Sequence, residues 1–69
     1  MTFIHHETVT AAGSNVDGVG EYNIIETNEG FMVYEGGYCH TSSGAYETFE
    51  EAMQKATELA VEFDGDPRI

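Results

Sequence analysis

One amphipathic helical segment near the C-terminal end limits the fold more than any other feature of the sequence. Thr48 is followed three residues later by Glu51, which is the spacing of a capping box, in which the two side chains satisfy free backbone N–H groups at the helix start. Residues that recur at helical spacing then form one apolar stripe: Phe49, Ala52, Met53, Ala56, Leu59, Ala60 and Phe63. Residues 64–67 bring Gly and Pro in the order typical of a helix end. The stripe must be buried against another layer, which the rest of the chain has to supply.

The segments before the helix have the composition of β-strands. Residues 2–10, 21–27 and 31–35 are rich in β-branched and aromatic side chains, and residues 38–41 are predicted as a short fourth strand. Asn28-Glu29-Gly30 predicts a hairpin turn, because Gly30 can adopt a positive φ. The sequence therefore predicts an α+β fold: an antiparallel meander of three to four short strands, with one C-terminal amphipathic helix packed on one face.

Alternation along the second and third predicted strands offers the helix two apolar sets. One is Tyr22, Ile24, Phe31 and Val33; the other is Ile25, Met32 and Tyr34. Alternation alone does not choose between the two sets. The set that does not contact the helix, together with the edge of the first strand, is a candidate contact for a homodimer. We expect a single domain over residues 1–63 and an acidic C-terminal tail over residues 64–69.

Residues 22–60 contain a pattern of residue types that spans two predicted strands and the helix. Tyr22-x-Ile24 comes first, then Gly30-Phe31-x-Val33, then Thr48-x-Glu50-Glu51-Ala52-x-x-x-Ala56-x-x-Leu59-Ala60. This order resembles an uncharacterised family of small strand-strand-helix bacterial domains, whose members show an aromatic-x-Val strand, a Gly-Trp-x-Val strand and a Thr-x-x-Glu-Ala helix start. The resemblance covers a little over half of the chain and implies a fold and no activity. The Lys and Arg residues that those domains often carry on the sheet are missing here, and the N-terminal strand has no counterpart.

Charge is the most unusual property of the composition. The chain has 13 acidic and 2 basic residues, for a formal net charge of −11, and both bases (Lys55 and Arg68) follow residue 54. Protein binding to phosphates depends on cations that neutralise them, so direct binding to DNA, RNA or anionic lipid is disfavoured. No apolar run is long enough to cross a membrane. A single cysteine, Cys39, is typical of a reducing compartment, and we expect a cytoplasmic protein.

Residues with metal-binding or nucleophilic chemistry form two adjacent pairs, His5-His6 and Cys39-His40. Neighbouring residues of a strand point to opposite faces, so each pair offers one ligand to a common site, fewer than zinc takes from a protein. A reactive thiolate needs a positive environment, which this acidic chain does not offer. A fold of one sheet and one helix at this size rarely encloses a small-molecule pocket. We expect a non-enzymatic protein with no catalytic residues, no metal and no cofactor.

The predicted helix carries a line of acidic residues opposite its apolar stripe. Glu51, Glu58 and Glu62 lie at similar angles around the axis, at spacings of about 6 to 10 Å, which are comparable to those of successive phosphates. Glu58 and Glu62 are a like-charge pair one turn apart, which costs roughly 0.2–0.5 kcal/mol. The full acidic set is Glu47, Glu51, Glu58, Glu62, Asp64 and Asp66, and its last members follow the helix end, where the dipole favours cations.

Two explanations of this acidity stay open. In one, a small cellular domain uses its charge for solubility or for adaptation to salt. In the other, the acidic set imitates phosphates and binds a basic nucleic-acid-handling protein or complex. In size and charge the chain resembles phage anti-CRISPR and anti-restriction proteins. That resemblance implies an inhibitor that occupies a basic nucleic-acid-binding surface, and a location in the host cytoplasm if a phage encodes it.

Overall fold

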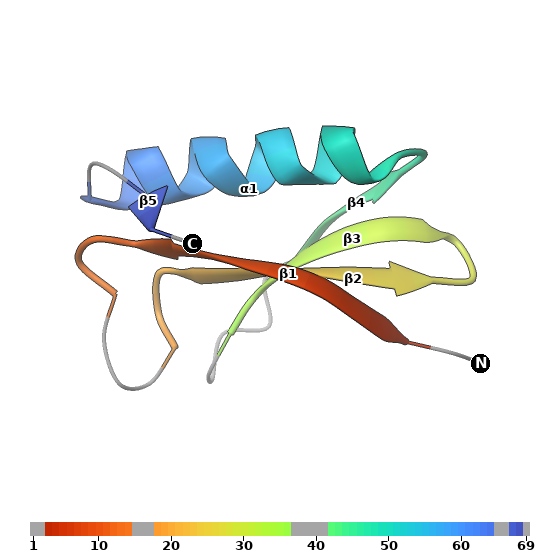
Figure 1. Ribbon diagram of the computed structural model, residues 1–69, viewed down its shortest axis with the longest axis horizontal. Helices are drawn as coiled ribbons and strands as arrows, with labels where there is room; N and C mark the ends of the chain where they lie inside the picture. Colours follow the sequence, from red (N-terminus) through yellow and green to blue (C-terminus); the bar gives the residue numbers. More distant parts are fainter. Residues whose placement is uncertain (1–2, 15–17, 37–41, 65–66, 69) are drawn as a thin grey trace.

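Five strands and one helix form two layers. The computed structural model describes residues 3–14, 18–36, 42–64 and 67–68. Figure 1 shows the helix lying along one face of a twisted sheet whose strand order is β4-β3-β2-β1-β5, with all neighbours antiparallel. The elements are β1 (Ile4–Ala11), β2 (Glu21–Thr27), β3 (Gly30–Glu35), β4 (Ser42–Tyr46), α1 (Phe49–Asp64) and β5 (Pro67–Arg68). The predicted α+β architecture, a meander with one C-terminal helix packed on the sheet, is confirmed.

β4, the second strand that pairs with β3, was not predicted from the sequence. Residues 38–41, the predicted strand, lie outside the described residues, and the strand that pairs with β3 is β4 at Ser42–Tyr46. Ser and Gly are uncommon in strands, so Ser42-Ser43-Gly44 has the composition of a turn. Pairing with an existing strand overrides that local preference: Tyr46 lies opposite Phe31, and the Tyr46 hydroxyl is 3.1 Å from Ser43 Oγ.

The C-terminal tail predicted at residues 64–69 also needs correction. Asp64 is the last residue of α1, and Pro67 and Arg68 form β5, which pairs with Ala11 and Thr10 of β1. Proline is tolerated in a strand at a sheet edge, where a missing backbone N–H breaks no ladder. The chain after α1 therefore returns to the sheet and covers part of the β1 edge (Figure 1).

The helix start follows the capping-box prediction. The Glu51 N–H donates to Thr48 Oγ1 at 3.2 Å, and the Thr48 N–H donates to Glu51 Oε1 at 3.3 Å. These two bonds satisfy backbone donors that the first helical turn leaves unpaired.

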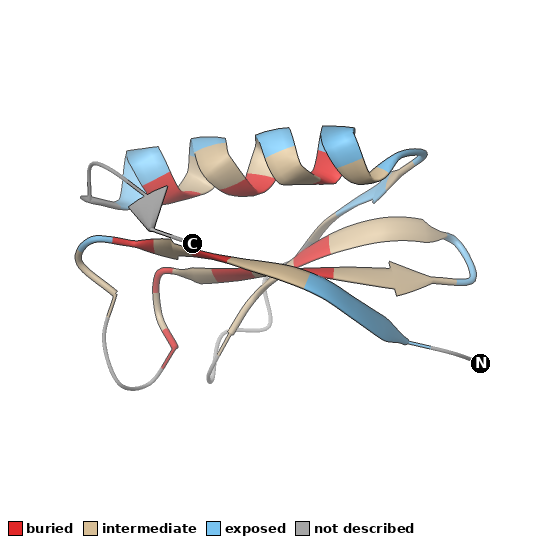
Figure 2. Cartoon of the chain, in the orientation of Figure 1, coloured by how far each residue is buried: buried red, intermediate tan, exposed pale blue. Residues whose placement is uncertain are grey.

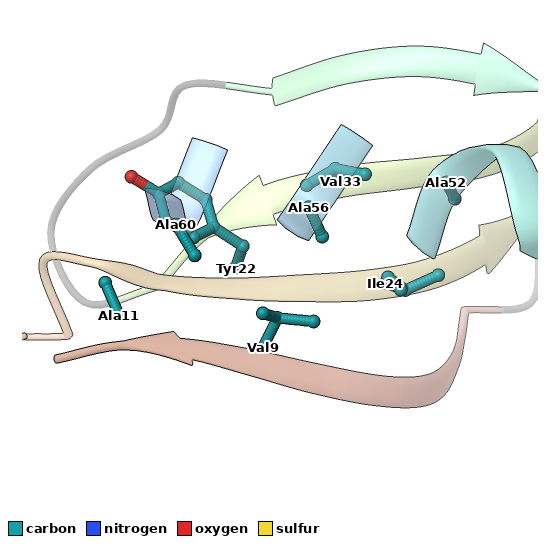
Figure 3. Packing of buried hydrophobic residues seen from close by; sticks show 8 residues of the cluster. All are labelled: Val9, Ala11, Tyr22, Ile24, Val33, Ala52, Ala56 and Ala60. Atoms are coloured by element: carbon teal, nitrogen blue, oxygen red, sulfur yellow. The ribbon is translucent and has the colours of Figure 1, made fainter. Parts of the chain in front are cut away.

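The core is small and built around alanines. Ala52, Ala56 and Ala60 are fully buried and recur every four residues, so one narrow side of α1 lies close to the sheet. The other buried apolar residues are Val9, Ala11, Tyr22, Ile24 and Val33, which Figure 3 shows with the three alanines. Of the two apolar sets on β2 and β3, the one that contains Ile24 therefore contacts α1. The set of Ile25, Met32 and Tyr34 lies on the opposite side of the sheet, which we call the open face.

Phe63, predicted as part of the apolar stripe, is 39% exposed. It lies at the end of α1 beside Gly20, where an added Cβ would be 3.0 Å from Phe63 Cε1 and 3.0 Å from Ser14 Cα. Gly20 has a φ of 92°, its N–H donates to Glu35 Oε2 at 3.0 Å, and its carbonyl accepts the Ala11 N–H at 2.8 Å.

Substitution of Gly20 tests this junction. We expect Gly20→Ala to lower the free energy of unfolding by about 1–3 kcal/mol, because a side chain is strained at this φ and its Cβ has no space. Urea unfolding followed by circular dichroism measures the loss. A change smaller than about 0.5 kcal/mol would show that the loop adapts to the added methyl group without strain.

Candidate protein-binding face

The acidic residues predicted on the helix lie on its outward side. Glu51, Glu58 and Glu62 are exposed, as is Glu47 just before the helix, whereas the three buried alanines point to the sheet. Figure 2 shows this division along α1, with buried segments toward the sheet and exposed segments away from it. We call Glu47, Glu51, Glu58 and Glu62 the acidic face. Of the other two predicted residues, Asp64 ends α1 and Asp66 lies outside the described residues.

Glu51 has two roles in this arrangement. Its Oε1 accepts the Thr48 N–H and also lies 3.3 Å from Thr48 Oγ1, so the carboxylate that belongs to the acidic face also caps the helix. Replacing Glu51 by Ala would remove charge and cap together. Replacing it by Gln removes the charge and keeps an acceptor at the capping position.

Lys55 is the basic residue of α1, and it lies one turn from both Glu51 and Glu58. Among the described residues, no Lys, Arg or His side chain is within ion-pairing distance of Glu51, Glu58 or Glu62, and the ion pair that the described residues form joins His6 to Glu26. Lys55 is half-buried on α1 and makes no such pair. The negative charges of this face are therefore available to a partner.

The surface between the glutamates is not uniformly charged. Val61 is 51% exposed and lies in a shallow, open hollow on the outer side of α1, whose described lining residues are Gln54, Thr57, Glu58, Val61 and Glu62. The Thr57 hydroxyl donates to the Met53 carbonyl at 2.9 Å and so is used within the helix. Sequence reasoning missed this hollow. The sequence does contain a signal for the hollow, because Val61 is an apolar residue of the helix that lies outside the apolar stripe.

The two adjacent histidines lie on opposite sides of the sheet, as the strand geometry predicted. His5 Nε2 is 2.8 Å from Thr8 Oγ1 on the open face, while His6 Nε2 is 2.9 Å from Glu26 Oε1 on the helix side. The His6 ring also contacts the rings of Phe31 and Phe49, at centroid distances of 5.2 and 5.8 Å. His6 therefore joins β1 to the start of α1, and the two histidines do not share a site.

The remaining pair of the predicted chemical residues, Cys39 and His40, lies outside the described residues. In the part of the chain that the structure describes, no three His, Cys, Asp or Glu side chains are grouped so that they could hold a metal ion. That part also contains no helix with the length and apolarity of a membrane span.

No protein-family model, curated protein or solved structure matches this chain. The resemblance of residues 22–60 to strand-strand-helix bacterial domains stays a prediction. A functional inference for this chain therefore rests on the chemistry of its own surface, where the acidic face and its hollow are the main features.

Proposed function

We propose that this chain is a non-enzymatic acidic protein that binds a basic, nucleic-acid-binding surface of another protein through the acidic face of α1. The observation that carries the proposal is the exposure of Glu51, Glu58 and Glu62 on one side of α1, with no cation of the described residues in ion-pairing distance. Such a surface is complementary to a row of Lys and Arg side chains, and complementarity of this kind speeds encounter and selects partners.

The uneven distribution of charge favours binding over solubility as the reason for the acidity. Solubility is served by charge anywhere on the surface, and it does not require Glu58 and Glu62 to stand one turn apart at an electrostatic cost. The strands give a contrast. By register, Glu7, Glu26 and Glu35 lie on the helix side of the sheet, and the centre of the open face has no acidic residue.

The hollow around Val61 can make the acidic face selective among basic partner proteins. Lys and Arg side chains have apolar stems and charged ends, so a stem can pack on Val61 while its charge approaches Glu58 or Glu62. Apolar contact of this kind would make binding depend on shape as well as charge. The partner would then be held with more specificity than charge alone provides.

A chain that occupies the phosphate-binding surface of another protein prevents that protein from binding nucleic acid. Phage anti-CRISPR and anti-restriction proteins, which the chain resembles in size and charge, are the class of inhibitor that this mechanism suggests. In this role the chain needs neither a catalytic group nor a cofactor. The partner is a basic protein or complex that handles nucleic acid.

A capture experiment tests the proposal. The tagged chain is incubated with a nuclease-treated bacterial lysate at about 50 mM salt, and captured proteins are identified by mass spectrometry. We expect a basic nucleic-acid-binding protein that is released when salt is raised to about 500 mM, because exposed ion pairs are screened. Capture of neutral proteins alone, or of partners that salt does not release, would contradict the proposal.

Adaptation to salt is the alternative that this proposal has to exclude. A domain adapted to high salt needs ions to screen its own repulsion, so it should unfold at low ionic strength. Circular dichroism from about 10 mM to about 2 M NaCl distinguishes the two explanations. A chain that is fully folded at the low end does not need its acidity for folding in salt.

A further inference from the structure

The open face of the sheet carries two apolar side chains at its centre, Ile25 and Met32, and no layer of the described structure lies over it. His5, Ile25 and Met32 are register partners across β1, β2 and β3, and Thr8, Asn23 and Tyr34 form the next row. Phe3, which is 59% exposed, joins Met32 and Tyr34 around a hollow of about 170 Å³, whose other described lining residues are Thr27, Asn28 and Glu29. Figure 1 shows α1 on the other side of the sheet.

Polar groups on this face are already bonded to one another. The Thr8 hydroxyl donates to Asn23 Oδ1 at 2.7 Å, so the 2.8 Å contact between Thr8 Oγ1 and His5 Nε2 requires the imidazole to donate. These bonds pair part of the polar surface of the face, so a second copy that covers it has less unpaired polar surface to desolvate.

The charge of the open face indicates which kind of partner can cover it. The chain has a net charge of −11, yet the described residues of this face carry no acidic side chain between Glu21 at one end and Glu29 in the β2–β3 turn at the other. A surface meant for a basic partner would be acidic here, as α1 is. Two copies of so acidic a chain can approach closely only where neither presents carboxylates. The rows that contain Ile25 and Asn23 meet that condition, and Glu29 lies at the rim of the hollow beside Phe3.

We propose that two copies of this chain associate through their open faces, with the row of Ile25 and Met32 and the neighbouring Phe3 and Tyr34 at the centre of a two-fold contact. In a two-fold dimer each copy presents the same patch, which suits a face whose centre carries no acidic side chain. The acidic faces of the two α1 helices then lie on opposite outer sides of the dimer.

The free edge of β1 is a weaker site for the second copy. Its register shifts between His5 and Glu7, and such irregularities protect sheet edges from pairing with another strand. An antiparallel pair of β1 edges would also bring the two Glu7 side chains toward each other. The face is therefore preferred over the edge.

The size of the patch sets the strength of the dimer. Three strands about 4.8 Å apart and about five residues long give a footprint of roughly 240 Å² for each copy. This is small for a stable interface, so we expect a weak dimer with a Kd of roughly 100 µM. Because repulsion between the two chains is screened by ions, salt should tighten the dimer, which is opposite to its effect on a charge-driven complex.

Sedimentation equilibrium from about 10 µM to about 1 mM, in about 50 and 500 mM NaCl, tests the proposal. We expect a monomer–dimer equilibrium that is tighter at the higher salt. Phe3→Glu should raise the dimer Kd about tenfold or more, because it places a charge in the contact at a position too exposed to support the fold. Val61→Glu is the matched control: it adds the same charge at a residue 51% exposed on α1, and it should leave the Kd at the higher salt within about twofold.

The wild-type chain gives a second measurement, which needs no substitution and so does not depend on the stability of a variant. Amide chemical shifts measured between about 1 mM and about 20 µM should change at Thr8, Asn23, Ile25, Met32 and Tyr34, and stay constant on the outer side of α1. Three results would overturn the proposal: a monomer at about 1 mM in both salts, equal weakening by Phe3→Glu and Val61→Glu, or shift changes confined to the edge of β1.

Discussion

Replacing Ile24 by Ala should lower the free energy of unfolding by about 2–5 kcal/mol, the largest stability effect that we expect from a single change in this chain. Ile24 is fully buried with Val9 and Val33, and it is among the largest of the fully buried side chains. The three alanines of α1 above it are too short to fill the space that a truncated side chain leaves. A domain of this size rarely has more than about 3–5 kcal/mol in total, so the variant should be largely unfolded in mild urea.

Ile25 provides the matched control, because it is the same residue at the adjacent position and on the opposite face of β2. It is half-buried on the open face, and Ile25→Ala should cost less than about 1.5 kcal/mol. Urea unfolding of both variants at about 10 µM, where the proposed dimer is dissociated, gives the comparison. Equal losses at the two positions would contradict the assignment of α1 to the face that holds Ile24.

Neutralising the acidic face should have the largest effect on binding. The triple variant Glu51→Gln, Glu58→Gln and Glu62→Gln should weaken binding to the captured basic partner by about tenfold to a hundredfold at about 50 mM salt. Exposed ion pairs contribute about 0.5–1 kcal/mol each, and three are removed together. Titration calorimetry or surface plasmon resonance with the purified partner measures the change. Glutamine at position 51 keeps the helix cap, so a loss of binding cannot be ascribed to unfolding.

A second triple variant separates position from net charge. Glu7→Gln, Glu21→Gln and Glu29→Gln remove the same number of charges from β1, β2 and the β2–β3 turn, and none of these residues belongs to the acidic face. We expect binding within about threefold of the wild type, since long-range attraction falls a little while the contact surface is unchanged. If both triple variants weakened binding equally, the partner would respond to total charge and the acidic face would have no special role.

Local rules predicted the helix well, since the capping box and the apolar stripe each depend on residues a few positions apart. The choice between the two faces of the sheet could not be predicted in the same way. Ile24 and Ile25 are adjacent and identical, and the difference between them comes from packing: Val9 and Ala11 of β1 are buried on the side that holds Ile24. The register shift after His5 interrupts alternation along β1, so that strand gave no independent indication of the buried side.

Long-range pairing accounts for β4 and β5, the two strands that the sequence did not predict. Ser43 and Gly44 have turn-like composition, yet Ser43 pairs with Val33. Backbone pairing with β3 stabilises a strand that the local sequence does not favour. Pro67 becomes part of the sheet because the end of α1 returns the chain beside Ala11, which no local pattern reveals. On the helix, by contrast, angular position alone placed Glu51, Glu58 and Glu62 on the outward side.

Displacement of nucleic acid is the measurement that tests the central claim most directly. The captured partner is loaded with a short fluorescent nucleic acid that it binds, and the chain is titrated in while anisotropy reports the bound fraction. We predict that the chain releases the nucleic acid, and that the helix triple variant needs about tenfold or more higher concentration to do so. If the chain and the nucleic acid bound the partner together, with anisotropy unchanged or raised, the acidic face would not occupy the nucleic-acid surface and the account would be wrong.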